Sequence, residues 1–240
     1  PLGIVTDANL ALEDELELTA RPYAGEHLLR TLAQSGQSIV KEYPPTYTHN
    51  VSLTRDGAYY NITRQGSGDS IIEYQLPPSD STCTYYFDCF DSLQNNLNEP
   101  YYKAFSIYID GELVNREYPT QSLNGIFELT VRANQSVRVT LTVHKDVSVR
   151  SFGVFSVSHD ALAQTLASMR TAQMQTGRDT VSGTATAQQD GEYLFLSLPY
   201  DKGYTAVVNG QTVPILRVFD TWMAIPLEKG ENTVSLRYQP

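Results

Sequence analysis

The sequence predicts a mainly β protein, in which two antiparallel β-sandwich units of a jelly-roll-like kind are joined by a helical segment. Short runs of alternating apolar and polar residues recur between residues 38 and 157 and again between 180 and 238. Two of these runs turn back at Asp110-Gly111 and Asn209-Gly210, pairs that suit the positive φ angles of a type I′ hairpin. The stretch between the two regions instead repeats its apolar residues at helical spacing.

Two helices are predicted from such spacing. The first runs from about Ala24 to Gln34, and Gly36 follows as a stop signal. The second occupies residues 158–176, with Ser158 as N-cap and Gly177 after its end. Their apolar stripes are formed by Leu28, Leu29 and Leu32 in the first helix and by Leu162, Leu166 and Met169 in the second.

These elements divide the chain into four parts. In order they are an N-terminal extended segment with a short helix at 1–37, a first β-sandwich at 38–157, a connecting helix at 158–178 and a second, smaller β-sandwich at 179–240. Residues 107–114 and 206–213 both read as strand, two-residue turn and strand. In each β region an apolar strand, a polar turn and an alternating strand follow. Two copies of one β unit would explain this echo; the alternative is that any two hairpins look alike.

Charge excludes one class of partner. The chain has 17 Lys and Arg against 27 Asp and Glu, a net charge of −10. This charge repels nucleic-acid phosphates and anionic membrane surfaces, so we expect no nucleic-acid partner and weak binding to polyanionic polymers.

The ends of the chain indicate a piece of a larger protein. The chain begins at Pro1 without Met or a signal peptide, contains no run of 18 apolar residues, and stops directly after a strand-like run. We therefore expect membrane segments of the parent protein to lie outside this chain.

No catalytic residue, metal site or cofactor is predicted. The four histidines, His27, His49, His144 and His159, lack a second ligand at metal spacing, and no nucleophile elbow or phosphate-binding loop appears. Three carboxylates surround the cysteine segment without the spacing of a calcium loop, and we interpret them as solvated strand ends: Asp80, Asp88 and Asp91.

The two cysteines leave a choice open. In one straight strand Cys83 and Cys89 share a face but lie about 20 Å apart, far beyond disulfide reach. A turn or bulge between them would permit a bridge, and free buried thiols are the alternative.

Three aromatic residues oppose the apolar faces of their strands. Trp222 points away from the face that carries Met223 and Ile225, and Tyr193 and Phe195 oppose the leucines of their own strand. Large aromatics in such positions need a cover. We expect the connecting helix or the first sandwich to provide it; the sharper alternative is a platform on which sugars stack.

The C-terminal sixty residues resemble a signature of the YfhO-like family of bacterial membrane proteins. The resemblance is carried by Leu194–Tyr204 (LFLSLPYDKGY), Val208-Asn209-Gly210, Trp222–Ile225 and Leu227–Asn232, and more weakly by Arg21-Pro22-Tyr23 with the leucines that follow. Three positions depart from the family pattern: Arg21 replaces the usual Asn, Tyr204 the usual Trp, and Asn232 stands where His is common.

The resemblance implies a polytopic protein similar to glycosyltransferases that use lipid-linked sugars, with a large extracytoplasmic domain near its C-terminus. The catalytic carboxylate of those enzymes lies near the N-terminal membrane spans, so no catalytic residue carries over. We expect a non-catalytic, extracytoplasmic domain at the cell membrane, whose partners are the membrane-embedded part of the same chain and a cell-surface glycan or polymer such as lipoteichoic acid. Trp222, Tyr193, Phe195 and Tyr204 are the candidate interface or glycan contacts.

Two rival interpretations come from other functional classes. One is a free-standing surface module that binds carbohydrate or a protein partner, because sandwiches host many unrelated functions. The other is a secreted glycosidase, which only the scattered carboxylates support.

Overall fold

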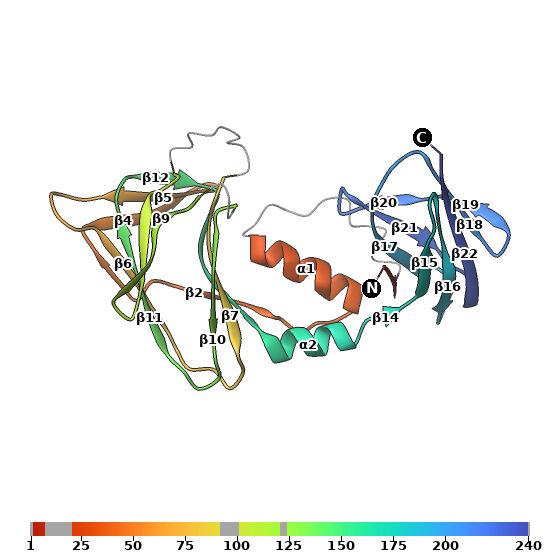
Figure 1. Cartoon of the computed structure of the whole chain (residues 1–240), viewed down its shortest axis with the longest axis horizontal. Coiled ribbons are helices and arrows are strands. Elements are labelled where there is room, and N and C mark those ends of the chain that lie inside the picture. The colour runs from red at the N-terminus through yellow and green to blue at the C-terminus, as the bar shows by residue number, and fades with distance from the viewer. Residues whose placement is uncertain (1, 8–20, 92–100, 121–123, 240) are drawn as a thin grey trace. The chain divides into compact units, whose positions relative to one another are not determined.

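The structure is a computed structural model that describes residues 2–7, 21–91, 101–120 and 124–239. The described residues form two compact units (Figure 1). The first unit contains residues 21–24 and Ser38–Leu162; the second contains residues 2–7, Gly25–Gln37 and 163–239. The fold is mainly β and antiparallel throughout, which confirms the predicted fold class.

The first unit is built from three sheets. A four-stranded sheet has the order β10-β7-β13-β2, a five-stranded sheet the order β3-β6-β11-β8-β9, and a three-stranded sheet the order β12-β5-β4. The strands are β2 (Val40–Tyr43), β3 (Tyr47–His49), β4 (Val51–Asp56), β5 (Tyr59–Arg64), β6 (Ile71–Leu76), β7 (Cys83–Phe90), β8 (Phe105–Ile109), β9 (Glu112–Tyr118), β10 (Ile126–Val131), β11 (Val137–Val143), β12 (Val147–Val149) and β13 (Ser151–Ser158).

The second unit contains two five-stranded sheets. One has the order β14-β1-β17-β21-β20 and the other the order β15-β16-β22-β18-β19. The strands are β1 (Gly3–Thr6), β14 (Arg170–Thr171), β15 (Gln173–Thr176), β16 (Thr180–Ala187), β17 (Tyr193–Pro199), β18 (Tyr204–Val208), β19 (Gln211–Val213), β20 (Leu216–Val218), β21 (Trp222–Pro226) and β22 (Gly230–Tyr238). Two helices, α1 (Arg21–Ala33) and α2 (His159–Ala167), each contribute residues to both units.

The strand orders of the two units correspond. The sheet β3-β6-β11-β8-β9 has the same order as β15-β16-β22-β18-β19, and β10-β7-β13-β2 matches β21-β17-β1-β14. Both turns at the predicted hairpins have positive φ, with 49° and 91° at Asp110 and Gly111 and 51° and 83° at Asn209 and Gly210. These hairpins join β8 to β9 and β18 to β19, as the sequence predicted.

The first turn residue also plays the same part in both units. The amide of Asp110 donates to the carbonyl of Arg138, whose own amide donates to the Asp110 carboxylate at 2.9 Å. Asn209 exchanges the same pair of hydrogen bonds with Thr233, and the Thr233 amide lies 2.9 Å from the Asn209 side-chain oxygen. A common strand order and a common turn contact favour two copies of one β unit over two unrelated hairpins.

This correspondence reveals a reciprocal exchange of strands. If each repeat runs strand, helix and then a series of strands, β1 and α1 open the first repeat, and β13 and α2 open the second. Yet β1 pairs with β14 and β17, which belong to the second repeat, while β13 pairs with β2 and β7 of the first. Each repeat therefore donates its opening strand to the sandwich of the other.

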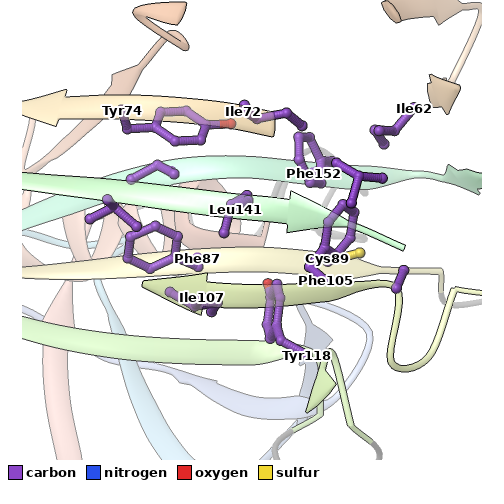
Figure 2. Packing of buried hydrophobic residues seen from close by; sticks show 14 of the residues in the cluster. Ile62, Ile72, Tyr74, Phe87, Cys89, Phe105, Ile107, Tyr118, Leu141 and Phe152 are labelled. Carbon is purple, nitrogen blue, oxygen red and sulfur yellow. The ribbon is translucent and has the colours of Figure 1, made fainter. Parts of the chain in front are cut away.

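Each unit has a core of its own. In the first unit, Ile72 and Tyr74 from one sheet meet Phe87 and Cys89 from another, and all four are at most 1% exposed (Figure 2). In the second unit the core includes Val5 of β1 together with Leu194, Leu236 and Ile225. Because these side chains come from facing sheets, their burial holds the layers together.

Three predicted boundaries are wrong. The connecting helix, expected over 158–178, ends at Ala167, because the chain then forms β14 and β15 on the two sheets of the second unit. The N-terminal extended segment is not separate, because β1 lies inside a sheet of the second unit. The first helix starts at Arg21, ahead of the expected Ala24. The pairing of β1 with β14 and β17 decides where the connecting helix ends and where the N-terminal segment lies. Local periodicity does not encode such pairing between distant strands.

Candidate functional site

The aromatic residues predicted as interface or glycan contacts do not form an open platform. Phe195 is 3% exposed, and Tyr193 and Trp222 are half-buried against the same cluster. Phe195 and Trp222 pack edge to face with ring centroids 6.2 Å apart. The other members of this cluster are Ile4, Leu28, Leu32, Met169, Leu216, Val218, Phe219 and Ala224.

The cover of these aromatics therefore comes from α1, through Leu28 and Leu32, and from Met169 just after α2. Phe219 belongs to this cluster too, and not to the core that contains Met223. Its φ of 49° and the φ of 55° at Asp220 place both residues in a turn, so the alternation does not extend back to Phe219.

Tyr204, the fourth predicted contact, lies apart from this cluster. Its ring packs on Tyr238 with centroids 4.8 Å apart, and it lines an open cavity of about 400 Å³ with Tyr200 and Lys202. The structure thus brings three of the four predicted residues together and leaves Tyr204 elsewhere in the second unit.

Another signature residue, Asn232, organises a turn. It is 0% exposed, and its side-chain amide donates to the carbonyls of Glu228 and Gly230 at 2.7 and 3.0 Å. Its side-chain oxygen accepts hydrogen bonds from the Glu228 amide and the Asn209 side chain, both at 3.1 Å. Asn232 therefore fixes the entry into β22 and ties it to the β18–β19 hairpin.

The strongest candidate for ligand binding is a cavity of about 250 Å³ in the first unit, which we call the tyrosine pocket. It is lined by Glu42, Tyr43, Pro44, Pro45, Leu53, Thr54, Arg55, Tyr60, Tyr74, Phe152 and Gly153. Apart from Pro44 and Pro45, which follow β2, these residues come from β2, β4, β5 and β6 and from β13, which lies far from the other four in the sequence. An apolar lining with a few polar groups is typical of small-molecule sites.

The polar groups of the pocket occupy defined places. The Arg55 guanidinium lies over the Tyr60 ring, 5.1 Å from its centroid. The Glu42 carboxylate accepts a hydrogen bond from the Tyr23 hydroxyl at 3.3 Å. Burial raises the pKa of Tyr74, and the negative charge of Glu42 raises this pKa further, so the Tyr74 hydroxyl keeps its proton at neutral pH. The pocket thus offers aromatic faces, a carboxylate acceptor and a guanidinium donor.

Gly153 lines the tyrosine pocket and has no side chain to narrow it. A Cβ at position 153 would lie 2.9 Å from the ring of Phe155 and 3.8 Å from the Glu42 carboxylate. A larger side chain would therefore displace Phe155 or crowd the Glu42 carboxylate beside the cavity.

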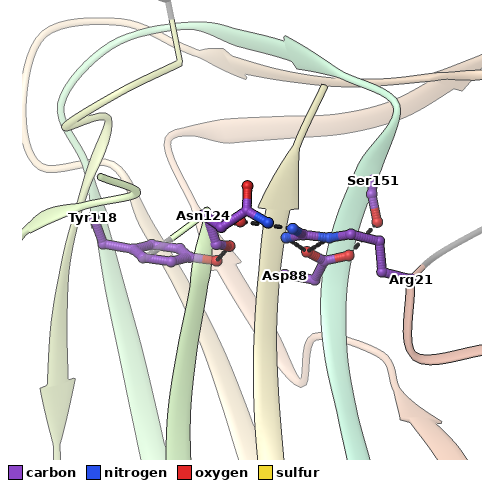
Figure 3. A network of polar contacts seen from close by, with 6 residues as sticks. Arg21, Asp88, Tyr118, Asn124 and Ser151 are labelled. Carbon is purple, nitrogen blue, oxygen red and sulfur yellow. Dashed lines mark hydrogen bonds and ion pairs between the residues drawn. The ribbon is translucent and has the colours of Figure 1, made fainter. Parts of the chain in front are cut away.

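A second polar cluster, around Asp88, is structural. Asp88 is 1% exposed and pairs with Arg21, whose Nε lies 2.9 Å from its carboxylate (Figure 3). Ser151 donates to the other carboxylate oxygen, and Arg21 also donates to the Asn124 carbonyl at 2.6 Å. The Arg21 guanidinium lies 4.2 Å from the Phe90 ring centroid. The charged groups of Arg21 and Asp88 pair with each other and with neighbouring groups of the same unit, as a structural ion pair does.

The interpretation of the nearby carboxylates as solvated strand ends is wrong for two of them. Asp88 and Asp91 are each 1% exposed, while Asp80 is exposed. The Arg150 Nε lies 3.9 Å from the Asp91 carboxylate. A sequence cannot distinguish a solvated carboxylate from one that a distant arginine neutralises, because the partner follows from the fold.

The cysteines are free thiols at the two ends of β7. Both are buried, and burial raises the pKa of Cys89 well above its usual range, with the Asp88 charge adding to this effect. Of the two alternatives that the sequence left open, a disulfide or free buried thiols, the structure has the free thiols, because both cysteines lie in one strand.

Three of the four histidines make contacts within the fold. His144 and His159 hydrogen-bond to the hydroxyls of Ser106 and Thr84 at 2.7 and 2.9 Å, and His27 packs edge-on against Phe219. In the part of the chain that the structure describes, no group of three or more His, Cys, Asp or Glu side chains is arranged to hold a metal ion. Within those same residues, neither helix has the length and apolar character needed to cross a bilayer.

Sequence reasoning missed the tyrosine pocket. The only signal was composition, since the chain has 16 Tyr against 8 Phe. A tyrosine has an apolar face and a polar tip, so an excess of it is typical of half-wet surfaces. Which tyrosines gather at one place depends on the pairing of distant strands.

Comparison with known proteins identifies relatives. The family model described as "Bacterial membrane protein YfhO" matches residues 1–240. The uncharacterized protein YfhO of Bacillus subtilis (strain 168) is 21% identical over 217 residues, which cover 86% of this chain. The match covers 24% of that relative, so this chain spans about a quarter of its length.

Solved structures show only partial likeness. A Paenibacillus cycloisomaltooligosaccharide glucanotransferase, solved with cycloisomaltoheptaose, overlaps 84% of this chain and 46% of its own at 7% identity, with a TM-score of 0.29. An anti-sigma factor domain-containing protein from Clostridium clariflavum overlaps 70% of this chain and 74% of its own at 12% identity, with a TM-score of 0.22.

Proposed function

Because the chain belongs to the YfhO family of bacterial membrane proteins, we propose that it is a non-catalytic, extracytoplasmic part of such a protein that holds a saccharide of a cell-surface polymer. The membrane-embedded remainder of the same protein would carry out glycosyl transfer onto that polymer, of which lipoteichoic acid is one example. In this arrangement the chain supplies recognition of the acceptor and the rest of the protein supplies the chemistry.

The tyrosine pocket carries this proposal. Sugar rings have apolar C–H faces that pack on aromatic rings, and hydroxyls around their edge that bond to carboxylates and guanidinium groups. The pocket presents the rings of Tyr43 and Tyr60 together with the charged groups of Glu42 and Arg55. A cavity of about 250 Å³ suits one small ligand rather than a large one.

The charge of the chain supports an acceptor role for uncharged sugars. A net charge of −10 weakens the attraction of any polyanionic backbone, so binding must come from local contacts with the sugar. Glu42 and Arg55 at the pocket have opposite charges, so the pocket does not favour a ligand of either charge.

Binding is tested on the purified chain and in cells. We expect saturation-transfer NMR to detect glucose or its oligomers on the wild-type chain, and Tyr60→Ala to abolish the signal. Tyr47→Ala is the matched control, because Tyr47 is 51% exposed and lies outside the pocket lining. In the full-length protein, Tyr60→Ala should lower glycosylation of the cell-surface polymer and Tyr47→Ala should not. Equal effects of the two variants would refute the role of the pocket.

The extracytoplasmic side is tested separately. Leu113 is 41% exposed in the β8–β9 hairpin, whereas Cys83 and Cys89 are buried. In the full-length protein, Leu113→Cys should react with a membrane-impermeant maleimide on intact cells. Labelling that appears only after the cells are permeabilised would place the chain in the cytoplasm and overturn this part of the proposal.

A further inference from the structure

A second cavity adjoins the tyrosine pocket along β2. It has a volume of about 580 Å³ and lies entirely in the first unit. Val40, Lys41 and Tyr43 of β2 line it, while Glu42 and Tyr43 of the same strand line the tyrosine pocket. Tyr43 is the residue common to both linings, so the two cavities meet at this residue.

The contacts of Tyr43 hold its ring in place. The Ser156 hydroxyl donates to the Tyr43 hydroxyl at 3.3 Å, and the Tyr43 and Tyr85 ring centroids are 5.4 Å apart. The Lys41 ammonium lies 5.1 Å from the centroid of the Tyr43 ring. A half-buried ring fixed in this way offers a preformed surface to a ligand that passes from one cavity to the other.

The second cavity differs in chemistry from the first. Its lining is rich in hydroxyls, from Ser38, Ser79, Ser156 and Ser158. Its two charged side chains, Lys41 and Asp80, have opposite signs, as do Glu42 and Arg55 at the tyrosine pocket. Over both cavities the charges balance, so the combined surface is complementary to an uncharged ligand with many hydroxyl groups.

We propose that the two cavities form one cleft that binds an uncharged oligosaccharide of at least two sugar rings, one on each side of Tyr43. The inference rests on the proposed function, because it extends the sugar bound in the tyrosine pocket into a chain. The first ring occupies the tyrosine pocket, and the chain continues past Tyr43 into the hydroxyl-lined cavity. The site thus recognises a segment of polymer rather than a single sugar.

Chain length is the variable that tests this cleft. We would titrate the 240-residue chain with glucose, the maltose series and the gentiobiose series by isothermal calorimetry, with glucuronic acid as an anionic probe. We expect affinity to rise about tenfold from one sugar ring to two in at least one series. Glucuronic acid should bind no more tightly than glucose, since the cleft has no net charge.

Variants locate the second ring. Lys41→Ala should remove the gain from the second ring and leave the binding of glucose within about twofold. Tyr43→Ala, at a residue that lines both cavities, should weaken the binding of glucose and of the longer sugars alike. Lys41 is exposed, so its truncation preserves the fold, which circular dichroism checks. Tyr47→Ala again serves as the matched control.

The possible outcomes distinguish failure of the extended cleft from failure of the proposed function. Binding of sugars with no gain from chain length, and with no effect of Lys41→Ala, would overturn the extended cleft while the tyrosine pocket stands. No binding of any saccharide would overturn both. Preference for glucuronic acid over glucose would contradict the uncharged ligand.

Discussion

The Arg21 guanidinium and the Asp88 carboxylate form an ion pair in the first unit, with Asp88 1% exposed and the Arg21 side chain 23% exposed. Arg21 begins α1 and Asp88 lies in β7, so the pair fixes the start of a helix against a strand 67 residues away. Removing one partner of a buried pair leaves the other charge without compensation.

Arg21→Ala should therefore lower the free energy of unfolding of the first unit by about 3 kcal/mol. Urea denaturation followed by circular dichroism measures the change. The control is Lys103→Ala, whose pair with Glu117 at 2.9 Å joins side chains that are 61% and 55% exposed and should contribute less than about 1 kcal/mol. A similar loss in both variants would contradict the assignment of Arg21–Asp88 as a buried structural pair.

Glu192 should make the second unit sensitive to acid. Burial raises its pKa, but hydrogen bonds from Arg170, at 2.9 Å to each carboxylate oxygen, and from the Gln188 amide outweigh burial and hold the pKa below the usual 4.5. Because the folded pKa is the lower one, the stabilisation is complete above the usual pKa of Glu and is lost as pH falls through the folded value.

Glu192→Gln should accordingly flatten the loss of stability below about pH 4.5, as measured by thermal unfolding over a pH series. Glu231→Gln is the control, since Glu231 is exposed. An unchanged slope in Glu192→Gln would show that Glu192 has no altered pKa in the folded chain.

The thiols should resist modification until the chain unfolds. Cys83 and Cys89 are 4% and 0% exposed, and the raised pKa of Cys89 keeps it protonated. We expect Ellman's reagent at pH 8 to react slowly with the native chain and to titrate two thiols in guanidinium without reductant. Absence of free thiols in the unreduced, unfolded chain would instead establish a disulfide.

Phe195 should be a core residue and not a sugar contact. It is 3% exposed beneath α1, so Phe195→Ala should destabilise the second unit by about 3–5 kcal/mol. At a temperature where the variant stays folded, its affinity for glucose oligomers should equal that of the wild type. If Phe195→Ala lost sugar binding with unchanged stability, the hypothesis that these aromatics form a platform for sugars would replace this one.

Strand β1 should be essential to the second unit, although it precedes the first unit in the sequence. Leu194, Phe195 and Leu196 of β17 pair with Val5, Ile4 and Gly3. Removal of residues 1–7 exposes this edge and takes Val5 out of the core, so amide hydrogen exchange in β17 should accelerate strongly. Exchange in β7, which pairs with β13 and β10, should change little. Unchanged protection of β17 would show that β1 is dispensable.

Local features of the fold were predictable from the sequence because neighbouring residues decide them. The turns at Asp110-Gly111 and Asn209-Gly210 follow from the ease with which Asp, Asn and Gly adopt positive φ. Alternation along 234–238 follows from the two-residue period of a strand with one buried face, and Val234 and Leu236 are indeed buried. The predominance of β structure is the sum of such local signals.

The candidate site could not be predicted in this way. Arg55 and Tyr60 face each other in the β4–β5 hairpin, but Tyr43 and Tyr74 are placed by the pairing of β2 with β13 and of β6 with β11, which are distant in the sequence. Trp222 and Phe195 drew attention because they oppose an apolar face, but the residues that cover them, Leu28 and Leu32, precede them by more than a hundred and fifty positions.

The sequence by itself determined the fold class, the two hairpins and the family to which the chain belongs, whereas the strand orders decided between two copies of one β unit and two unrelated hairpins. Only the tertiary structure decided that β1 and β13 exchange between the repeats, that Asp88 is buried against Arg21, and that three tyrosines and two charged residues surround one pocket. The physical reason is that the two kinds of feature depend on interactions over different distances along the sequence. Backbone conformation and periodicity depend on residues a few positions apart, whereas burial, ion pairing and cavities depend on which distant strands pair, and many pairings satisfy the same local pattern.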